Sequence, residues 1–106
     1  MPPYNRRQGT AEIDQGGAGT TTLVTAVPEY EICVLNYLVV LNVAGTFAFS
    51  DGTTWYTGDI PVAANGGVFA GATDAENPLF ITAKGAPLQI TTVTGSAHGH
   101  LRYEYR

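Results

Sequence analysis

The sequence predicts an all-β protein, an antiparallel β-sandwich with a jelly-roll-like arrangement of about eight short strands. Stretches rich in β-branched and aromatic residues recur about every 8 to 12 residues, and Gly, Pro, Asn and Asp turns separate them. No stretch has the periodicity of an amphipathic helix. An immunoglobulin-like sandwich is the alternative, although the single cysteine leaves that fold's disulfide impossible.

The chain is expected to divide into a short polar arm and one domain. With 106 residues it has the length of a single domain, which we expect to span residues 10–106. Residues 1–9 contain two prolines and no run that contributes to a core, so they are expected to form a flexible N-terminal arm.

Residues 30–43, YEICVLNYLVVLNV, form the densest apolar run and are expected to be the central strand. Alternation places apolar side chains on both faces, which predicts that both faces are covered. In so short a chain one cover is expected from another subunit. The predicted subunit interface consists of Tyr30, Ile32, Val34, Leu38 and Val40. A buried helix is the alternative, but the many β-branched residues argue against it. Cys33, inside the run, is expected to be a buried hydrophobe.

Shorter segments with alternating apolar residues are expected to form the other strands. In chain order they are residues 10–14, 20–27, 46–50, 60–63, 68–69, 78–83, 87–94 and 100–105. In the last of these, Leu101 is expected to face the core, and His100 and Glu104 to face solvent. Asp51-Gly52 is the strongest turn signal, and it predicts a type I′ hairpin over residues 46–57.

The composition is poor in charge and slightly acidic. Only 13% of the residues are charged, against about 25% in an average domain, and the net charge is −4. Such a surface suits packing against neighbouring subunits. Nucleic acid is not an expected partner, because Arg6 and Arg7 are the only paired basic residues. No membrane span and no signal peptide are expected, so the protein is expected to be soluble.

Candidate chemistry is sparse, and neither an enzyme nor a cofactor is expected. His98 and His100 are two apart and would share one side of a strand, but a metal site needs a third ligand that the sequence does not supply. A nucleophilic triad, a carboxylate pair in a cleft and a phosphate-binding loop are likewise not indicated. The aromatic set Trp55, Tyr56, Phe69 and Phe80 fits either a sugar-stacking platform or, more simply, the core.

Several short segments resemble small virion proteins of tailed phages, namely capsid decoration (cement) or head-fibre proteins. They are YEICVLNY at 30–37, GTF at 45–47, SDGTT at 50–54, PLF at 78–80, GAPL at 85–88 and GHLRY at 99–103. The resemblance implies a β-sandwich, made in the host cytoplasm, that assembles as a homotrimer on the capsid surface and stabilises the shell by contacts with the major capsid protein. It transfers no catalytic residue.

Three hypotheses follow for the function. The first is a bacteriophage decoration protein, with Tyr4, Arg6 and Arg7 as a capsid-binding arm, or alternatively as a tail without a role. The second is a carbohydrate- or receptor-binding module of a fibre or tail, which would use Trp55 and Tyr56 as its glycan platform. The third is a small metal-dependent enzyme that uses His98 and His100.

Overall fold

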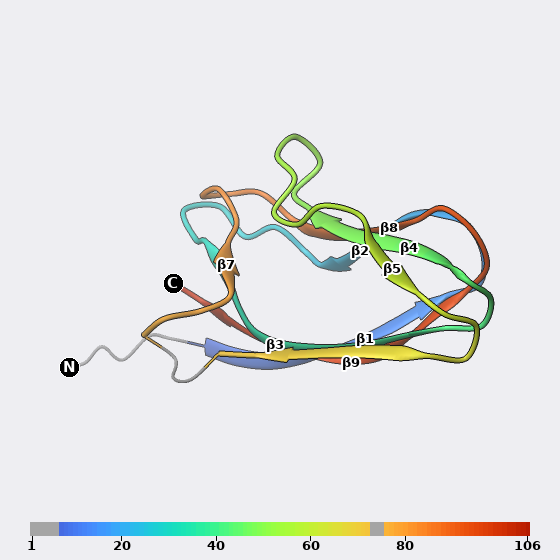
Figure 1. Cartoon of the computed structure of the whole chain (residues 1–106). Coiled ribbons are helices and arrows are strands. Elements are labelled where there is room, and N and C mark those ends of the chain that lie inside the picture. The colour runs from blue at the N-terminus through green and yellow to red at the C-terminus, as the bar shows by residue number, and fades with distance from the viewer. Residues whose placement is uncertain (1–6, 73–75) are drawn as a thin grey trace.

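The computed structural model describes residues 7–72 and 76–106, and all the regular elements among them are strands. Two antiparallel sheets pack face to face as a sandwich (Figure 1), which confirms the predicted fold class. The strands are β1 (Arg7–Gln15), β2 (Gly19–Val24), β3 (Ile32–Leu41), β4 (Gly45–Ser50), β5 (Ile60–Val62), β6 (Gly67–Gly71), β7 (Phe80–Ile81), β8 (Leu88–Thr92) and β9 (Ala97–Tyr105). In the described ranges, no helix is long and apolar enough to cross a membrane.

The strand order is that of a jelly roll. Sheet A has the order β1-β9-β3-β6, with β7 also paired to β3, and sheet B has the order β2-β8-β4-β5. The chain forms one long antiparallel ribbon in which β1 pairs β9, β2 pairs β8, β3 pairs β6 and β4 pairs β5. Rolling up this ribbon adds the pairs β9 with β3 and β8 with β4, which gives two sheets of the jelly-roll type.

The immunoglobulin-like alternative is wrong. In that fold the first two strands are neighbours in one sheet, whereas here β1 belongs to sheet A and β2 belongs to sheet B.

The core lies between the sheets and is centred on aromatic rings. Tyr37 packs against Phe49 with ring centroids 4.8 Å apart, and Phe47 meets Phe49 edge-on at 5.7 Å. Phe47 and Phe49 share the inner face of β4, as their spacing of two predicts. Aliphatic side chains from both sheets complete the core: Ile13, Val24, Ile32, Val34, Val39, Leu41, Val62, Leu88, Ile90, Ala97 and Leu101. Cys33 is fully buried, as expected.

The central strand contains a β-bulge that alternation alone does not predict. The register of β3 on β9 shifts between Val34 and Asn36, which leaves Leu35 as an extra residue. The bulge reverses which residues face inward, because one added residue turns the following side chains to the other face. Ile32 and Val34 face the core before the bulge, and odd-numbered residues face it afterwards.

The predicted hairpin over residues 46–57 is only partly formed. A bridge joins Ser50 to Trp55, and the Tyr56 amide donates to the Phe49 carbonyl at 2.9 Å, but the regular partner of β4 is β5. Gly52 has a φ of 93°, but Asp51 does not have the positive φ that a type I′ turn needs. The Asp51 carboxylate accepts hydrogen bonds from the Thr53 and Thr54 amides, and the Asp51 amide donates to the Thr54 carbonyl, so the chain turns at Gly52 and Thr53, one residue later than predicted. The loop projects from the sandwich between β4 and β5 (Figure 1).

The expected boundary of the arm at residue 9 is also corrected. Strand β1 begins at Arg7 and pairs with β9 from Arg7–Tyr105 onward, so the last three residues assigned to the arm belong to sheet A. The polar composition of these residues concealed the strand, because β-propensity reflects side-chain packing and burial and differs between edge and central strands.

Candidate functional site

The outer face of sheet A carries three rows of side chains that run across β1, β9, β3 and β6. The rows are Asp14, His98, Val40 and Gly67; Glu12, His100, Leu38 and Phe69; and Thr10, Arg102, Asn36 and Gly71. Charged groups thus occupy the β1 and β9 half of this face, and apolar groups occupy the β3 and β6 half.

We name Leu38, Val40 and Phe69 the apolar stripe. Phe69 is 67% exposed and lies directly opposite Leu38 in the β3–β6 register, while Leu38 and Val40 are half-buried. Gly67 and Gly71 flank Phe69 on β6, and a Cβ at Gly67 would lie 3.1 Å from Val40. The two glycines therefore leave the apolar side chains room to lie flat on the sheet. Exposed aromatic surface of this kind is typical of a contact surface.

The charged half holds His98 and His100, the residues that the third hypothesis assigns to a metal ion. Both lie on β9 and point to the same side, with His98 Nδ1 3.4 Å from Asp14 Oδ1 and His100 opposite Glu12. Among residues 7–72 and 76–106, no three His, Cys, Asp or Glu side chains are placed to hold a metal ion. The His98–Asp14 contact is exposed, so its contribution to stability is small.

The structure separates the five residues of the predicted subunit interface. Ile32 and Val34 have no exposed surface within the chain, so they are unable to contact another subunit. Tyr30 precedes β3 and packs edge-on against Tyr105, with ring centroids 6.2 Å apart. Only Leu38 and Val40 remain together on an exposed face. The bulge at Leu35 causes this division, because it changes the facing of the residues that follow it.

Aromatic composition alone does not place Phe69 on this surface, because it fits both a sugar-stacking platform and the core. The segment GVFAG at 67–71 does indicate its position. Side chains alternate between the two faces of a strand, so Phe69 shares a face only with Gly67 and Gly71, which have no side chains. A face with one large side chain cannot form a packed core, so Phe69 is expected on the outer face.

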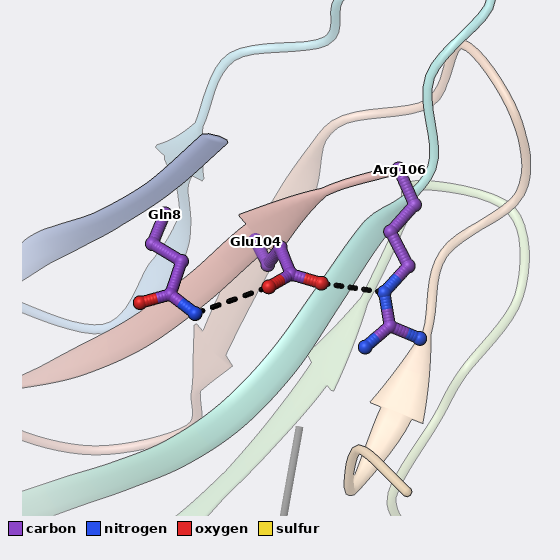
Figure 2. A network of polar contacts seen from close by, with 3 residues as sticks. All are labelled: Gln8, Glu104 and Arg106. Carbon is purple, nitrogen blue, oxygen red and sulfur yellow. Dashed lines mark hydrogen bonds and ion pairs between the residues drawn. The ribbon is translucent and has the colours of Figure 1, made fainter. Parts of the chain in front are cut away.

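A network of polar side chains lies at one end of sheet A (Figure 2). Glu104 is only 1% exposed although it was expected to face solvent, and Arg106 Nε donates to its Oε2 at 2.6 Å. Gln8 Nε2 donates to Glu104 Oε1 at 3.1 Å, and Gln8 Oε1 accepts from Arg102 at 3.1 Å. A buried carboxylate needs such partners. Gln8 therefore belongs to the folded domain, although it falls within the expected arm.

The proposed glycan platform is divided between an exposed ring and an engaged one. Trp55 is 59% exposed in the projecting loop. Tyr56 stacks on Phe80 with an interplanar angle of 4° and a centroid distance of 5.4 Å. Its hydroxyl donates to Asp51 Oδ2 at 2.5 Å and accepts from the Ala83 amide at 3.0 Å. Tyr56 thus anchors the loop to the β7 region, and Trp55 is the side chain that remains open to solvent.

The same contacts set the protonation of this pair. Burial alone raises the pKa of Asp51, but hydrogen bonds from Tyr56 and from the backbone outweigh burial and lower the pKa to about 2. Burial, followed by the hydrogen bond to Asp51, raises the pKa of Tyr56 to about 12. At neutral pH the pair is a carboxylate that accepts from a neutral phenol, which holds the base of the loop.

The candidate arm is only partly described. Tyr4 and Arg6 lie outside the described residues, and Arg7 is placed by its backbone at the start of β1. Their suggested role in binding a capsid stays a prediction.

Comparisons with known proteins give little beyond this geometry. No protein-family model matches the chain, and no curated protein matches it. One similar solved structure is the cryo-EM structure of a virus-like particle of the extra small virus (XSV) of the giant freshwater prawn Macrobrachium rosenbergii. The TM-score is 0.44 and the identity 12%, over 99% of this chain and 86% of that chain. A similarity this low assigns no function.

Proposed function

We propose that the protein is a structural component of a virus particle, and that it binds an assembled shell through the apolar stripe without catalysis. The observation that carries the proposal is Phe69, an aromatic side chain that is 67% exposed and lies opposite the half-buried Leu38 on the neighbouring strand. Burying such a ring on a partner is favourable, and aromatic residues are enriched at the centres of protein interfaces. The low charge content supports the same role, because interfaces that persist are poor in charge.

The jelly roll alone does not decide the function, because viral capsid proteins, lectins and cupins share it. The resemblance to decoration proteins of tailed phages gives the proposal its finer form. In that form the partner is the major capsid protein of a bacteriophage, the site is the outer surface of the head, and the unit that binds is a homotrimer.

The test is whether the chain is bound to particles. In gradient-purified virions from a culture that produces the protein, mass spectrometry should find it at a fixed ratio to the major capsid protein. Its absence from intact particles would overturn the virion role.

The stripe is tested by substituting Phe69 and measuring binding to shells that lack the protein. Phe69→Ser should lower the bound fraction by about tenfold, since burial of a Phe side chain contributes about 1.5 kcal/mol or more. Val93→Ser is the matched control, because Val93 is 61% exposed and follows β8 in the other sheet. Equal binding of both variants would exclude the stripe as the contact surface.

The second candidate, a glycan-binding module, is favoured by the exposure of Trp55 in a loop that stands away from the sandwich. Tyr56 does not contribute a stacking face in this version, because Phe80 already covers its ring. On a glycan array, Trp55→Ala should abolish any signal that the wild type gives, while Phe69→Ser should preserve it. A wild type that binds no glycan on the array would remove this candidate.

A further inference from the structure

The sandwich has four sheet edges, and they differ in how they resist pairing with another strand. An edge strand with unpaired backbone groups is a template for a further strand, and proteins usually block it with proline, a bulge, charged side chains such as lysine, or a very short strand. Strand β5 has three residues and contains Pro61, β6 has five residues with a glycine at each end, and β2 has a bulge between Thr22 and Val24.

Of these features strand β1 has only charged side chains, and the pairing register decides whether they repel a second strand. It pairs β9 over nine consecutive residues without a register shift, and its sequence RQGTAEIDQ contains no proline and no lysine. Among the described residues, no strand pairs with its other edge. Within residues 7–72 and 76–106, β1 is therefore a long, regular edge that is open to another strand.

The side chains of β1 favour a second copy of β1 as that strand. In antiparallel pairing, directly opposed residues share a face of the sheet. The two-fold axis that relates two copies of β1 must therefore pass between the two copies of one residue, and that residue defines the register. Centring on Ala11 pairs all nine residues and places Thr10 opposite Glu12 and Gln8 opposite Asp14. No carboxylate then faces a carboxylate.

The neighbouring registers are poorer. Centring the pair on Glu12 places the two Glu12 carboxylates directly opposite one another, which destabilises a strand pair. Centring on Thr10 avoids this repulsion but pairs only residues 7–13 and leaves Asp14 and Gln15 without a strand partner.

We propose that two copies of the chain associate through antiparallel β1–β1 pairing centred on Ala11, which joins their A sheets into one continuous sheet. This contact goes beyond the proposed function, because it concerns copies of the chain with one another and not the shell. Strand β1 is one edge of sheet A, and the apolar stripe lies on β3 and β6 toward the other edge, so pairing through β1 leaves the stripe open. A homotrimer built on another surface is compatible with this two-fold contact and would then associate in pairs.

Disulfide trapping tests the register directly. In the double variant Thr10→Cys/Glu12→Cys, the cysteines of two copies face one another at about 5 Å between Cβ atoms, so oxidation should trap a dimer on a non-reducing gel. Thr10→Cys alone and Glu12→Cys alone each face a residue without a thiol, and should trap at least fivefold less. The wild type controls for Cys33, which is fully buried. Absence of a trapped dimer in the double variant, or equal trapping in both single variants, would overturn the proposal.

A pair of charge variants separates association from folding. Thr10 is exposed and lies opposite Arg102 within its own chain and opposite Glu12 of the second copy. Thr10→Glu should weaken dimerisation about threefold or more, measured by sedimentation equilibrium. Thr10→Lys should strengthen it, because in this register the lysine is not left unpaired at an open edge but faces Glu12 of the second copy. Contacts within the chain predict the opposite order for the thermal midpoints, because Arg102 attracts Glu and repels Lys. Dimerisation constants that follow the order of the midpoints, or do not change, would contradict β1 pairing. Shell binding measured with the same variants tests the proposed function separately.

Discussion

Gly99 lies where the backbone of β9 passes close to the backbone of β3. It lies in the middle of β9 with a φ of 146°, and a Cβ there would overlap the backbone carbonyl of Leu38 on β3. Both the dihedral angle and the contact exclude a larger residue, and no rearrangement of a flexible side chain relieves a clash with backbone.

We expect Gly99→Ala to lower the free energy of unfolding by at least about 2 kcal/mol, because it adds strain and overpacking in the centre of the sheet. Urea unfolding monitored by circular dichroism measures the change. Gly16→Ala is the control, since nothing lies within 4 Å of its Cβ position and its φ is not positive. A loss of less than about 0.5 kcal/mol for Gly99→Ala would show that β9 and β3 are not in this close register.

Asp51 makes the stability depend on pH in acid. Its pKa is about 2 in the folded protein and 3.8 ordinarily, so its contribution is complete above about pH 4 and is lost as the pH falls toward 2. The difference corresponds to about 2 kcal/mol. We expect Asp51→Asn to be less stable at pH 7 and to lose less stability than the wild type between pH 4 and pH 2. Asp59→Asn, at an exposed carboxylate, is the control. Parallel acid limbs for wild type and Asp51→Asn would refute the assignment.

At the scale of the element, β3 shows what sequence patterns predict and what they miss. The run of β-branched residues locates the strand to within two residues at each end, because composition is a local property. The bulge at Leu35 escapes prediction, because it depends on how β3 aligns with β9, a partner that follows it by more than fifty residues. At Asp51 the local signal locates a turn but not its centre, because the side chain of Asp51 bonds the Thr53 and Thr54 amides and the turn forms at Gly52 and Thr53.

The bulge predicts unequal effects for residues that simple alternation places on one face. Ile32→Ala should cost about 3 kcal/mol because Ile32 is fully buried, whereas Leu38→Ala should cost less than about 1 kcal/mol. Chemical unfolding measures both free energies. Similar losses of unfolding free energy for the two variants would mean that the side chains of β3 do not switch faces at Leu35.

Strand β1 predicts different results for two deletions at the N-terminus. Removal of residues 1–9 eliminates three paired residues of β1 and the hydrogen bond from Gln8 to the buried Glu104, whereas removal of residues 1–6 keeps both. We expect the longer deletion to have a lower midpoint in thermal unfolding. Equal midpoints would show that the start of β1 contributes no stability. Shell binding by the shorter deletion then tests Tyr4 and Arg6 without damage to sheet A.

For the whole molecule, the sequence predicts the class of fold but not the surface that the fold presents. Short strands and turns are local features, and together they indicate a sandwich. The network of polar side chains at Glu104 joins residues up to 96 positions apart, and the apolar stripe combines β3 with β6. Such combinations arise only from strand order, which no local pattern specifies.

The ribbon topology also predicts slow folding for a domain of this size. Most of its pairings join distant parts of the chain, and domains with such pairings refold on the order of milliseconds to seconds. Stopped-flow refolding monitored by Trp55 fluorescence measures the rate. A refolding time in microseconds would show that local contacts dominate the transition state.

The place of β8 and β9 has a consequence for synthesis on the ribosome. These two strands leave the exit tunnel after all the others, yet β9 lies between β1 and β3 and β8 lies between β2 and β4. Until they emerge, each sheet lacks one of its interior strands, and the apolar side chains of β3 and β4 are not fully covered by the opposite sheet. The nascent chain therefore completes its fold only once β9 is free of the tunnel, and translation products that stop before Ala97 are expected to be substrates for chaperones and proteases.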